Sequence, residues 1–212
     1  DWLADAPGEA RPDNTPIFVV GLPRTGTTLT ERILSSHTQV ESIGETQVLH
    51  MLLRRASPAE SGGELTANVV AAAAKMPADR IAADYMEAVA FRLGTAPFFI
   101  DKLPENVLNL GFIAKAWPEA RIVHLRRHPM DACFAMYKQS YFRFAYDLND
   151  LAEYYLAYDR LSRHWRDTLG NRVIELEYEQ LVADHEAQTR QLLDRLGLEF
   201  EQACLDFDRN AA

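Results

Sequence analysis

Two glycines, Gly21 and Gly26, separate a hydrophobic run from a helical pattern in the segment PIFVVGLPRTGTTLTERILSSH, residues 16–37. The run before Gly21 predicts a buried strand, and the apolar residues after Gly26 recur at steps of three and four, which predicts a helix. A strand, a Gly-rich turn and a helix in this order are typical of a P-loop, whose backbone N–H groups and helix dipole bind phosphate. The segment therefore predicts an anion-binding site at the start of the first helix.

The predicted loop differs from that of a nucleoside triphosphatase at the position after Gly26. The triphosphate-binding motif has a lysine there that reaches the outer phosphates, whereas this chain has Thr27 followed by Thr28. Arg24 places a permanent cation inside the loop instead, and the threonines add hydroxyl donors. We predict that the anion-binding groups are those of Arg24, Thr25, Gly26, Thr27 and Thr28. The alternative is an ordinary Gly-rich turn between a strand and a helix.

A second basic element follows a strand predicted in RIVHLRRHPMDACFAMY, residues 121–137. This strand ends at Arg126 and Arg127, and Pro129 is well placed to open the next helix. Two arginines at the carboxyl end of a parallel strand form an anion site at the edge where such sheets bind ligands. The alternative is a pair of surface arginines that are ion-paired with nearby acids. The segment taken alone leaves both interpretations open.

A third strand end, in FFIDKLPEN, residues 98–106, carries Asp101 and Lys102. We predict that Lys102 points into the same crevice as the loop. Hydrophobic residues followed by an aspartate also describe the Mg²⁺-binding strand of a P-loop nucleoside triphosphatase. Asp101 therefore favours an alternative function, that of a Mg²⁺-dependent P-loop kinase or triphosphatase.

Strands and helices must alternate along the chain to bring these strand ends together. The strand candidates are residues 17–20, 97–101, 120–125 and 171–177, with a weaker one at 39–44. Helical periodicity between them predicts an α/β fold in three layers, in which helices flank a central parallel sheet. We expect one domain over residues 16–212, preceded by a Pro-, Gly- and Asp-rich arm or linker at residues 1–15.

The composition limits the classes of partner. The chain has 212 residues, 48% of them hydrophobic, which is enough for one sizeable core. Its net charge of −9 argues against broad binding of nucleic acid or of an anionic membrane. No apolar run approaches the roughly 20 residues that span a bilayer. The two cysteines, Cys133 and Cys204, indicate neither a disulfide framework nor a metal site.

These motifs together resemble the sulfotransferases that use 3′-phosphoadenosine-5′-phosphosulfate (PAPS) as donor. GLPRTGTT resembles that family's loop for the 5′-phosphosulfate, and LRRHPMDACFAMY resembles its element for the 3′-phosphate. The segment GETQ resembles tyrosylprotein sulfotransferases and bacterial sulfotransferases that carry tetratricopeptide repeats, and the tail beginning YEQLVADHEAQTRQ resembles the end of the core of the bacterial group. The resemblance covers about residues 16–207.

The resemblance implies a P-loop-type fold and metal-free in-line transfer of a sulfuryl group from PAPS, leaving 3′-phosphoadenosine 5′-phosphate (PAP). It implies that Arg24 and Lys102 neutralise the leaving phosphate and that Glu45 is the general base. The loop residues, with Arg126 and Arg127, would bind the nucleotide. The acceptor hydroxyl or amine stays open among peptide tyrosine, glycan, lipid and small alcohol. For a bacterial chain the expected location is the cytoplasm.

The chain departs from the family pattern at two places. The family commonly has a serine eight residues after the arginine that matches Arg127, where this chain has Ala135. The C-terminal segment that closes over the nucleotide has no match before Ala212, so we expect the domain to be incomplete there. A degenerate nucleotide-binding module is therefore the non-enzymatic alternative. For Glu45 the alternative role is that of an acid in the first turn of a helix, where it favours the helix dipole.

Overall fold

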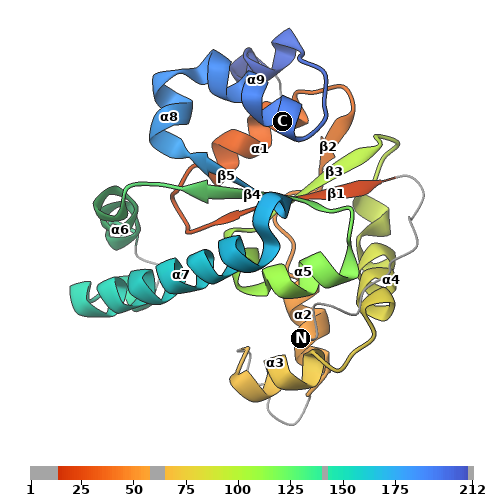
Figure 1. Ribbon diagram of the computed structural model, residues 1–212, viewed down its shortest axis with the longest axis vertical. Coiled ribbons are helices and arrows are strands. Elements are labelled where there is room, and N and C mark those ends of the chain that lie inside the picture. The colour runs from red at the N-terminus through yellow and green to blue at the C-terminus, as the bar shows by residue number, and fades with distance from the viewer. Residues whose placement is uncertain (1–13, 58–64, 140–142, 210–212) are drawn as a thin grey trace.

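The computed structural model describes residues 14–57, 65–139 and 143–209 and shows a sheet with helices on both faces (Figure 1). The strands are β1 (Thr15–Gly21), β2 (Val40–Ser42), β3 (Phe98–Lys102), β4 (Arg121–Arg126) and β5 (Val173–Glu177). Their order across the sheet is β2-β3-β1-β4-β5, and every neighbouring pair is parallel. The predicted three-layer α/β fold is confirmed. The predicted arm at residues 1–15 lies outside the described residues, except for its last two.

Two groups of helices enclose the sheet, and they lie on opposite sides of it in Figure 1. One face carries α1 (Thr27–Ser35), α8 (Tyr178–Ala183) and α9 (His185–Arg195). The other face carries α2 (Val48–Arg55), α3 (Ala67–Ala73), α4 (Ala78–Val89), α5 (Leu110–Ala116), α6 (Pro129–Tyr137) and α7 (Leu148–Leu169). None of the helices in the described part of the chain is long and apolar enough to cross a membrane.

The central strand explains why both faces need a cover. Along β1, Ile17 and Val19 belong to the hydrophobic cluster under α1, while Phe18 and Val20 belong to the cluster on the opposite face, and all four are fully buried. A strand that is apolar on both sides is typical of a parallel sheet between two helical layers. The side chains of the continuous hydrophobic run in the sequence are thus buried on both faces of the sheet.

The position of β1 between β3 and β4 sets the place of the site. The carboxyl ends of these three strands meet at one edge, because Val19 lies beside Lys102 of β3 and Gly21 lies beside Leu125 of β4. The connections from β1 and β3 leave this edge toward opposite faces of the sheet, through α1 and α5. Parallel sheets bind ligands at such a switch point.

Asp101 turns away from this edge and into the core. Its side chain is fully buried, and Oδ2 accepts hydrogen bonds from the Tyr85 hydroxyl at 2.5 Å and from Thr46 Oγ1 at 3.0 Å. Burial raises the pKa of the Asp101 carboxyl to about 6 against the opposing effect of these hydrogen bonds. The carboxyl is therefore a buried acceptor within the structural core, which removes the strongest sequence feature of the Mg²⁺-dependent alternative.

We expect Asp101→Asn to change how stability depends on pH. Because the folded protein keeps the Asp101 proton up to a pKa of about 6, the stability that this proton contributes is present at pH 4 and is lost as the pH rises through 6. An amide oxygen can still accept from Tyr85 and Thr46 but does not ionise. The free energy of unfolding of Asp101→Asn relative to wild type should therefore rise by about 2 kcal/mol between pH 4 and pH 7.

Urea unfolding at pH 4, 5, 6 and 7 measures this difference. Asp167→Asn, which neutralises an exposed aspartate on α7, is the control and should run parallel to wild type at every pH. A difference between Asp101→Asn and wild type that stays constant from pH 4 to pH 7 would show that Asp101 ionises as it does in the unfolded chain.

Candidate active site

The loop between β1 and α1 has the backbone of an anion cradle. Gly26 is the N-cap of α1 with φ 101°, and within the described chain no side chain caps this helix end. The first helical hydrogen bond runs from the Thr30 N–H to the Gly26 carbonyl at 3.1 Å, so the preceding N–H groups face the loop. Arg24 also has a positive φ of 67°, which is uncommon for a residue with a side chain and occurs at functional turns.

The three threonines of the loop have different environments. Thr25 is buried, and its hydroxyl donates to the Leu22 carbonyl at 2.7 Å, which shapes the loop from inside. Thr27 is also buried, whereas Thr28 and Arg24 are exposed at the carboxyl edge of the sheet. The exposed Thr28 and Arg24 are the loop side chains that can meet a ligand directly, and Thr25 acts on the shape of the loop.

Arg127 and the loop lie together, as the two basic motifs predict. Its Nη1 donates to the Arg24 carbonyl at 2.9 Å, and its guanidinium lies 4.6 Å from the centroid of the Tyr178 ring. Its Nε has no hydrogen-bond partner among residues 14–57, 65–139 and 143–209. Arg127 is thus oriented by the loop and by the ring, with donor capacity left over for an anion.

Tyr178 was missed by the motif analysis. Its ring packs against the loop so closely that a Cβ at Gly26 would lie 2.5 Å from Cδ2 of the ring. It opens α8 directly after β5, in the segment IELEYEQ. A large aromatic residue that follows a predicted strand end is the signal that could have placed it at this edge.

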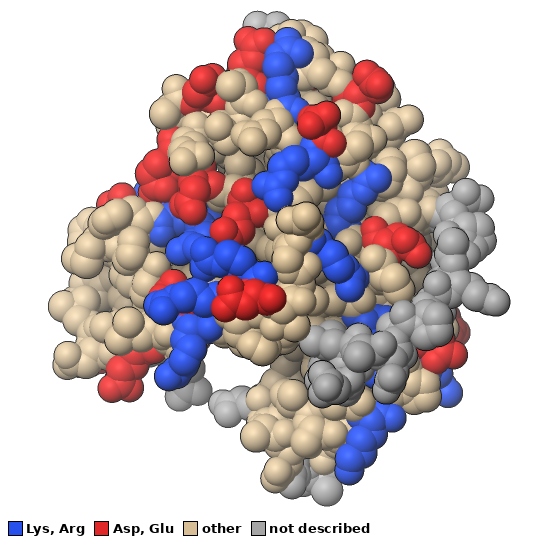
Figure 2. Space-filling view, in the orientation of Figure 1, with Lys and Arg blue, Asp and Glu red and all other residues tan. Residues whose placement is uncertain are grey.

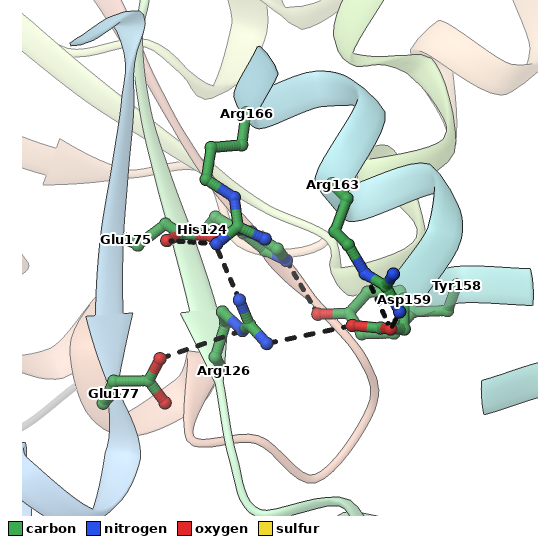
Figure 3. Close-up of polar contacts among 8 residues, drawn as sticks. All are labelled: His124, Arg126, Tyr158, Asp159, Arg163, Arg166, Glu175 and Glu177. Atoms are coloured by element: carbon green, nitrogen blue, oxygen red, sulfur yellow. Dashed lines mark hydrogen bonds and ion pairs between the residues drawn. The ribbon is translucent and has the colours of Figure 1, made fainter. Parts of the chain in front are cut away.

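Arg126 has a different environment from Arg127. It forms ion pairs with Glu175 at 3.4 Å, with Glu177 at 3.8 Å and with Asp159 at 3.8 Å (Figure 3). For Arg126 the geometry therefore matches the alternative of an arginine paired with acids, and its binding to a nucleotide stays a prediction. The acids come from β5 and α7, so these ion pairs tie β4 to both neighbours.

Two residues before Arg126 in β4 lies the buried, neutral His124. His124 Nε2 is 2.7 Å from the Tyr158 hydroxyl, and burial, helped by the charges of Arg126 and Arg166, lowers the pKa of His124 to about 3. Burial also raises the pKa of the Tyr158 hydroxyl. Both groups are uncharged at neutral pH, which lets them sit under the ion pairs without adding a buried charge. Figure 3 shows them between β4 and α7.

Lys102 is held between two carboxylates. Its side chain is 7% exposed, and Nζ lies 3.4 Å from Oε2 of Glu31 and in contact with Oε1 of Glu45. The structure thus brings together Lys102 and Glu45, which are 57 positions apart. Glu31 was missed by the motif analysis, although its place one helical turn after Thr27 in α1 could have indicated it.

Glu45 lies outside the helix that follows it. The helix α2 begins at Val48 with Gln47 as its N-cap, and its first turn contains no acidic residue. The interpretation of Glu45 as a first-turn acid is therefore wrong, because the helix starts later than the sequence pattern suggested. The Glu45 side chain is 57% exposed and can meet a ligand.

The site concentrates cations inside an acidic protein. Figure 2 shows Lys and Arg side chains mixed with Asp and Glu side chains on the visible face, with no uniformly basic surface there. Arg127 contacts the loop that carries Arg24, and Lys102, at the end of the strand beside β1, contacts the carboxylate of Glu45. This arrangement can bind an anion and remove a proton from a neighbouring group.

A model of the sulfotransferase family matches residues 16–202. Protein-tyrosine sulfotransferase 1 of Danio rerio is 25% identical over 194 residues, which are 89% of this chain and 55% of that protein. An uncharacterized protein of Aquifex aeolicus (strain VF5) is 29% identical over 218 residues, which are 94% of this chain and 28% of that protein. The chain therefore spans about half or less of the length of these two relatives.

Two solved structures show the same fold. The sulfotransferase domain of the olefin synthase of Synechococcus PCC 7002 aligns with a TM-score of 0.62 at 24% identity, over 96% of this chain and 80% of that one. The sulfotransferase domain from the curacin biosynthetic pathway aligns with a TM-score of 0.64 at 17% identity, over 95% and 80% of the two chains.

We expect Gly26→Ala to destabilise the protein more than Gly197→Ala. Both glycines have a positive φ, 101° and 61°, so alanine costs about 1–2 kcal/mol at either position. Among the described residues a Cβ at Gly197 would meet only Arg121, at 3.5 Å, whereas at Gly26 it would overlap the Tyr178 ring. Overpacking should add about 1–3 kcal/mol at Gly26, measured by urea unfolding. Equal losses would mean that Tyr178 moves aside without cost.

Proposed function

The chain belongs to the sulfotransferase family, and we propose that it transfers the sulfuryl group of PAPS to a hydroxyl or amine of an acceptor. The observation that carries this proposal is the meeting of the β4 end with the P-loop, where Arg127 donates to the Arg24 carbonyl. The Arg127 guanidinium thereby lies against the loop that carries Arg24. A donor with a phosphosulfate at its 5′ position and a phosphate at its 3′ position needs two such cations.

The loop residues would hold the two ends of the donor. The exposed Arg24 and Thr28, with the N–H groups that open α1, would bind the 5′-phosphosulfate. Arg127 would bind the 3′-phosphate through the guanidinium N–H groups that its hydrogen bond to the Arg24 carbonyl leaves free. This donor carries a phosphate and a sulfate at its 5′ end and no triphosphate. The loop therefore needs no lysine after Gly26 to reach a third phosphate.

The reaction joins an acceptor oxygen or nitrogen to sulfur as the bond between sulfur and the bridging oxygen of the 5′-phosphate breaks. The donor supplies the activated sulfuryl group, and the electron pair of the broken bond stays on the phosphate of PAP. Glu45 accepts the proton that the acceptor loses. Arg24 and Lys102 neutralise the negative charge that develops on the bridging oxygen, so catalysis rests on positioning and electrostatics.

Lys102 is suited to this role because its ammonium group has more hydrogen-bond donors than its two carboxylate partners use. An ammonium group has three donors, and two of them face Glu31 and Glu45. One donor is left for the bridging oxygen. Its low exposure also strengthens its interaction with a developing charge, because the field of a buried cation is less screened by water.

The acceptor class is the open part of the proposal. The candidates are peptide tyrosine, glycan, lipid and small alcohol. One relative carries the name protein-tyrosine sulfotransferase 1, so a phenolic hydroxyl is the first acceptor to screen.

Calorimetric titration with PAP and with ATP, each with and without Mg²⁺, tests the proposed function. We expect PAP to bind equally with Mg²⁺ or with a chelator and ATP to bind weakly in both conditions. ATP binding that requires Mg²⁺ would instead support a P-loop kinase or triphosphatase. Absence of nucleotide binding would support a degenerate module.

Arg127→Ala should weaken PAP binding by about 1.5–3 kcal/mol, the range for charge-assisted hydrogen bonds, in the same titration. Adenosine 5′-phosphosulfate lacks the 3′-phosphate and should bind both proteins alike. Arg190→Ala is the matched control, because Arg190 also lies over an aromatic ring, that of Phe200, but on α9. Equal losses for both ligands would make Arg127 a structural residue of the loop.

Glu45→Gln should lower turnover by about 100-fold or more, which is the lower part of the range for a general base. The amide keeps the shape of the side chain but cannot accept the proton, so PAP affinity and thermal stability should stay near wild type. Turnover is measured with labelled PAPS and an alkyl alcohol or a phenol. The phenol should be less sensitive, because it needs less help to lose its proton.

Glu87→Gln, which changes an exposed glutamate on α4, is the control for this experiment and should leave turnover unchanged. If Glu45→Gln keeps turnover within about threefold of wild type on the alcohol, Glu45 does not act as the base.

A further inference from the structure

Glu31 connects the helix of the donor loop to both members of the Glu45–Lys102 pair. It lies in α1, four residues after Thr27, and its side chain is 15% exposed. Each of its two carboxylate oxygens has a separate partner. Oε1 accepts from Ser42 Oγ at 2.6 Å, and Oε2 lies 3.4 Å from Lys102 Nζ.

The first oxygen acts on the turn that carries Glu45. Ser42 Oγ, which donates to Glu31, itself accepts from the Gly44 N–H at 3.0 Å. The Gly44 carbonyl accepts from the Lys102 N–H at 3.1 Å, and Gly44 has a φ of 73°. Both peptide groups of the residue before Glu45 are therefore held, one of them through Glu31.

The second oxygen acts on Lys102 itself. Of the two carboxylates beside Nζ, that of Glu31 is the less exposed, at 15% against 57% for Glu45. Glu31 also sits on a rigid support, because α1 packs on β3 through Ile33, Leu34 and Ile100. Glu45 lies in an irregular segment between β2 and α2. Glu31 is thus the fixed partner of Lys102 and Glu45 the adjustable one.

We propose that Glu31 is a positioning residue that keeps Lys102 in place while Glu45 takes up the acceptor's proton. This inference rests on the proposed sulfuryl transfer. When Glu45 becomes neutral, Lys102 loses the attraction of one carboxylate, and its four-carbon side chain is otherwise free to rotate. The charge of Glu31 does not change in the step, so the ammonium stays beside the bridging oxygen where negative charge develops.

Glu31→Gln separates the two roles of the carboxylate. The amide oxygen can still accept from Ser42, but the negative charge beside Lys102 is gone. We expect kcat to fall about 10- to 100-fold, as for a misplaced catalytic group. The Kd of PAP and the KM of PAPS should stay within about twofold, because Glu31 touches neither end of the donor in the proposed mode of binding. Glu31→Asp, which keeps the charge on a shorter side chain, should recover part of the loss.

Making Glu31→Gln both in the wild-type protein and in a Lys102→Met protein distinguishes a positioning role from a structural role. If Glu31 acts through Lys102, Glu31→Gln should cause no further loss in a Lys102→Met protein, measured in single turnovers with labelled PAPS. A structural role would reduce the rate by the same factor in both backgrounds. Glu186→Gln is the matched control, because Glu186 is also a helical glutamate paired with a cation, Arg190 on α9.

Each result bears on the inference. An unchanged kcat in Glu31→Gln, an equal loss in both backgrounds, or a parallel loss of PAP binding and thermal stability would overturn the role of Glu31 while leaving sulfuryl transfer intact. A wild-type protein that neither binds PAP nor consumes labelled PAPS in a mixture of a phenol, a primary alcohol and an amine contradicts the proposed function. The inference about Glu31 then falls with it.

Discussion

The parallel pairing of β1 with β3 on one side and with β4 on the other is the constraint on which the site depends. The register places Val19 beside Lys102 and Gly21 beside Leu125. As a result the P-loop, the lysine that ends β3 and the two arginines at the end of β4 lie at a single edge of the sheet. A shift by one residue would turn Lys102 to the opposite face of the sheet, because side chains alternate along a strand.

The two adjacent arginines at this edge differ in how their charge is balanced, and this difference separates a structural role for Arg126 from a ligand-binding role for Arg127. Arg126 faces Asp159, Glu175 and Glu177 and joins β4 to β5 and α7. Arg127, the next residue, contacts a carbonyl and an aromatic ring and forms no ion pair with an acid in the part of the chain that the structure describes. A guanidinium that is oriented without being neutralised retains its attraction for phosphate.

The core beneath the site contains two ionisable groups whose charged forms are disfavoured by burial. In β3 the pKa of Asp101 is raised to about 6, and in β4 the pKa of His124 is lowered to about 3. Each is hydrogen-bonded to a tyrosine, Tyr85 and Tyr158 respectively. Desolvation disfavours the charged form in both cases. These hydrogen bonds join β3 to α4 and β4 to α7 in the core, whereas the proposed ligand-binding side chains lie at the loop edge of the sheet.

The sequence by itself determined the strands, the P-loop and the family, because these follow from local patterns of hydrophobicity, glycine and charge that a short segment contains completely. Tertiary structure decided which partners the individual charged side chains contact. Arg126 and Arg127 are adjacent and chemically identical, yet their contacts come from β5 and α7 in one case and from a loop 103 positions away in the other. Likewise the two carboxylates beside Lys102 come from α1 and from the segment after β2, and no spacing rule relates them. Electrostatic partners depend on distance in space, and only the packing of helices on the sheet determines that distance.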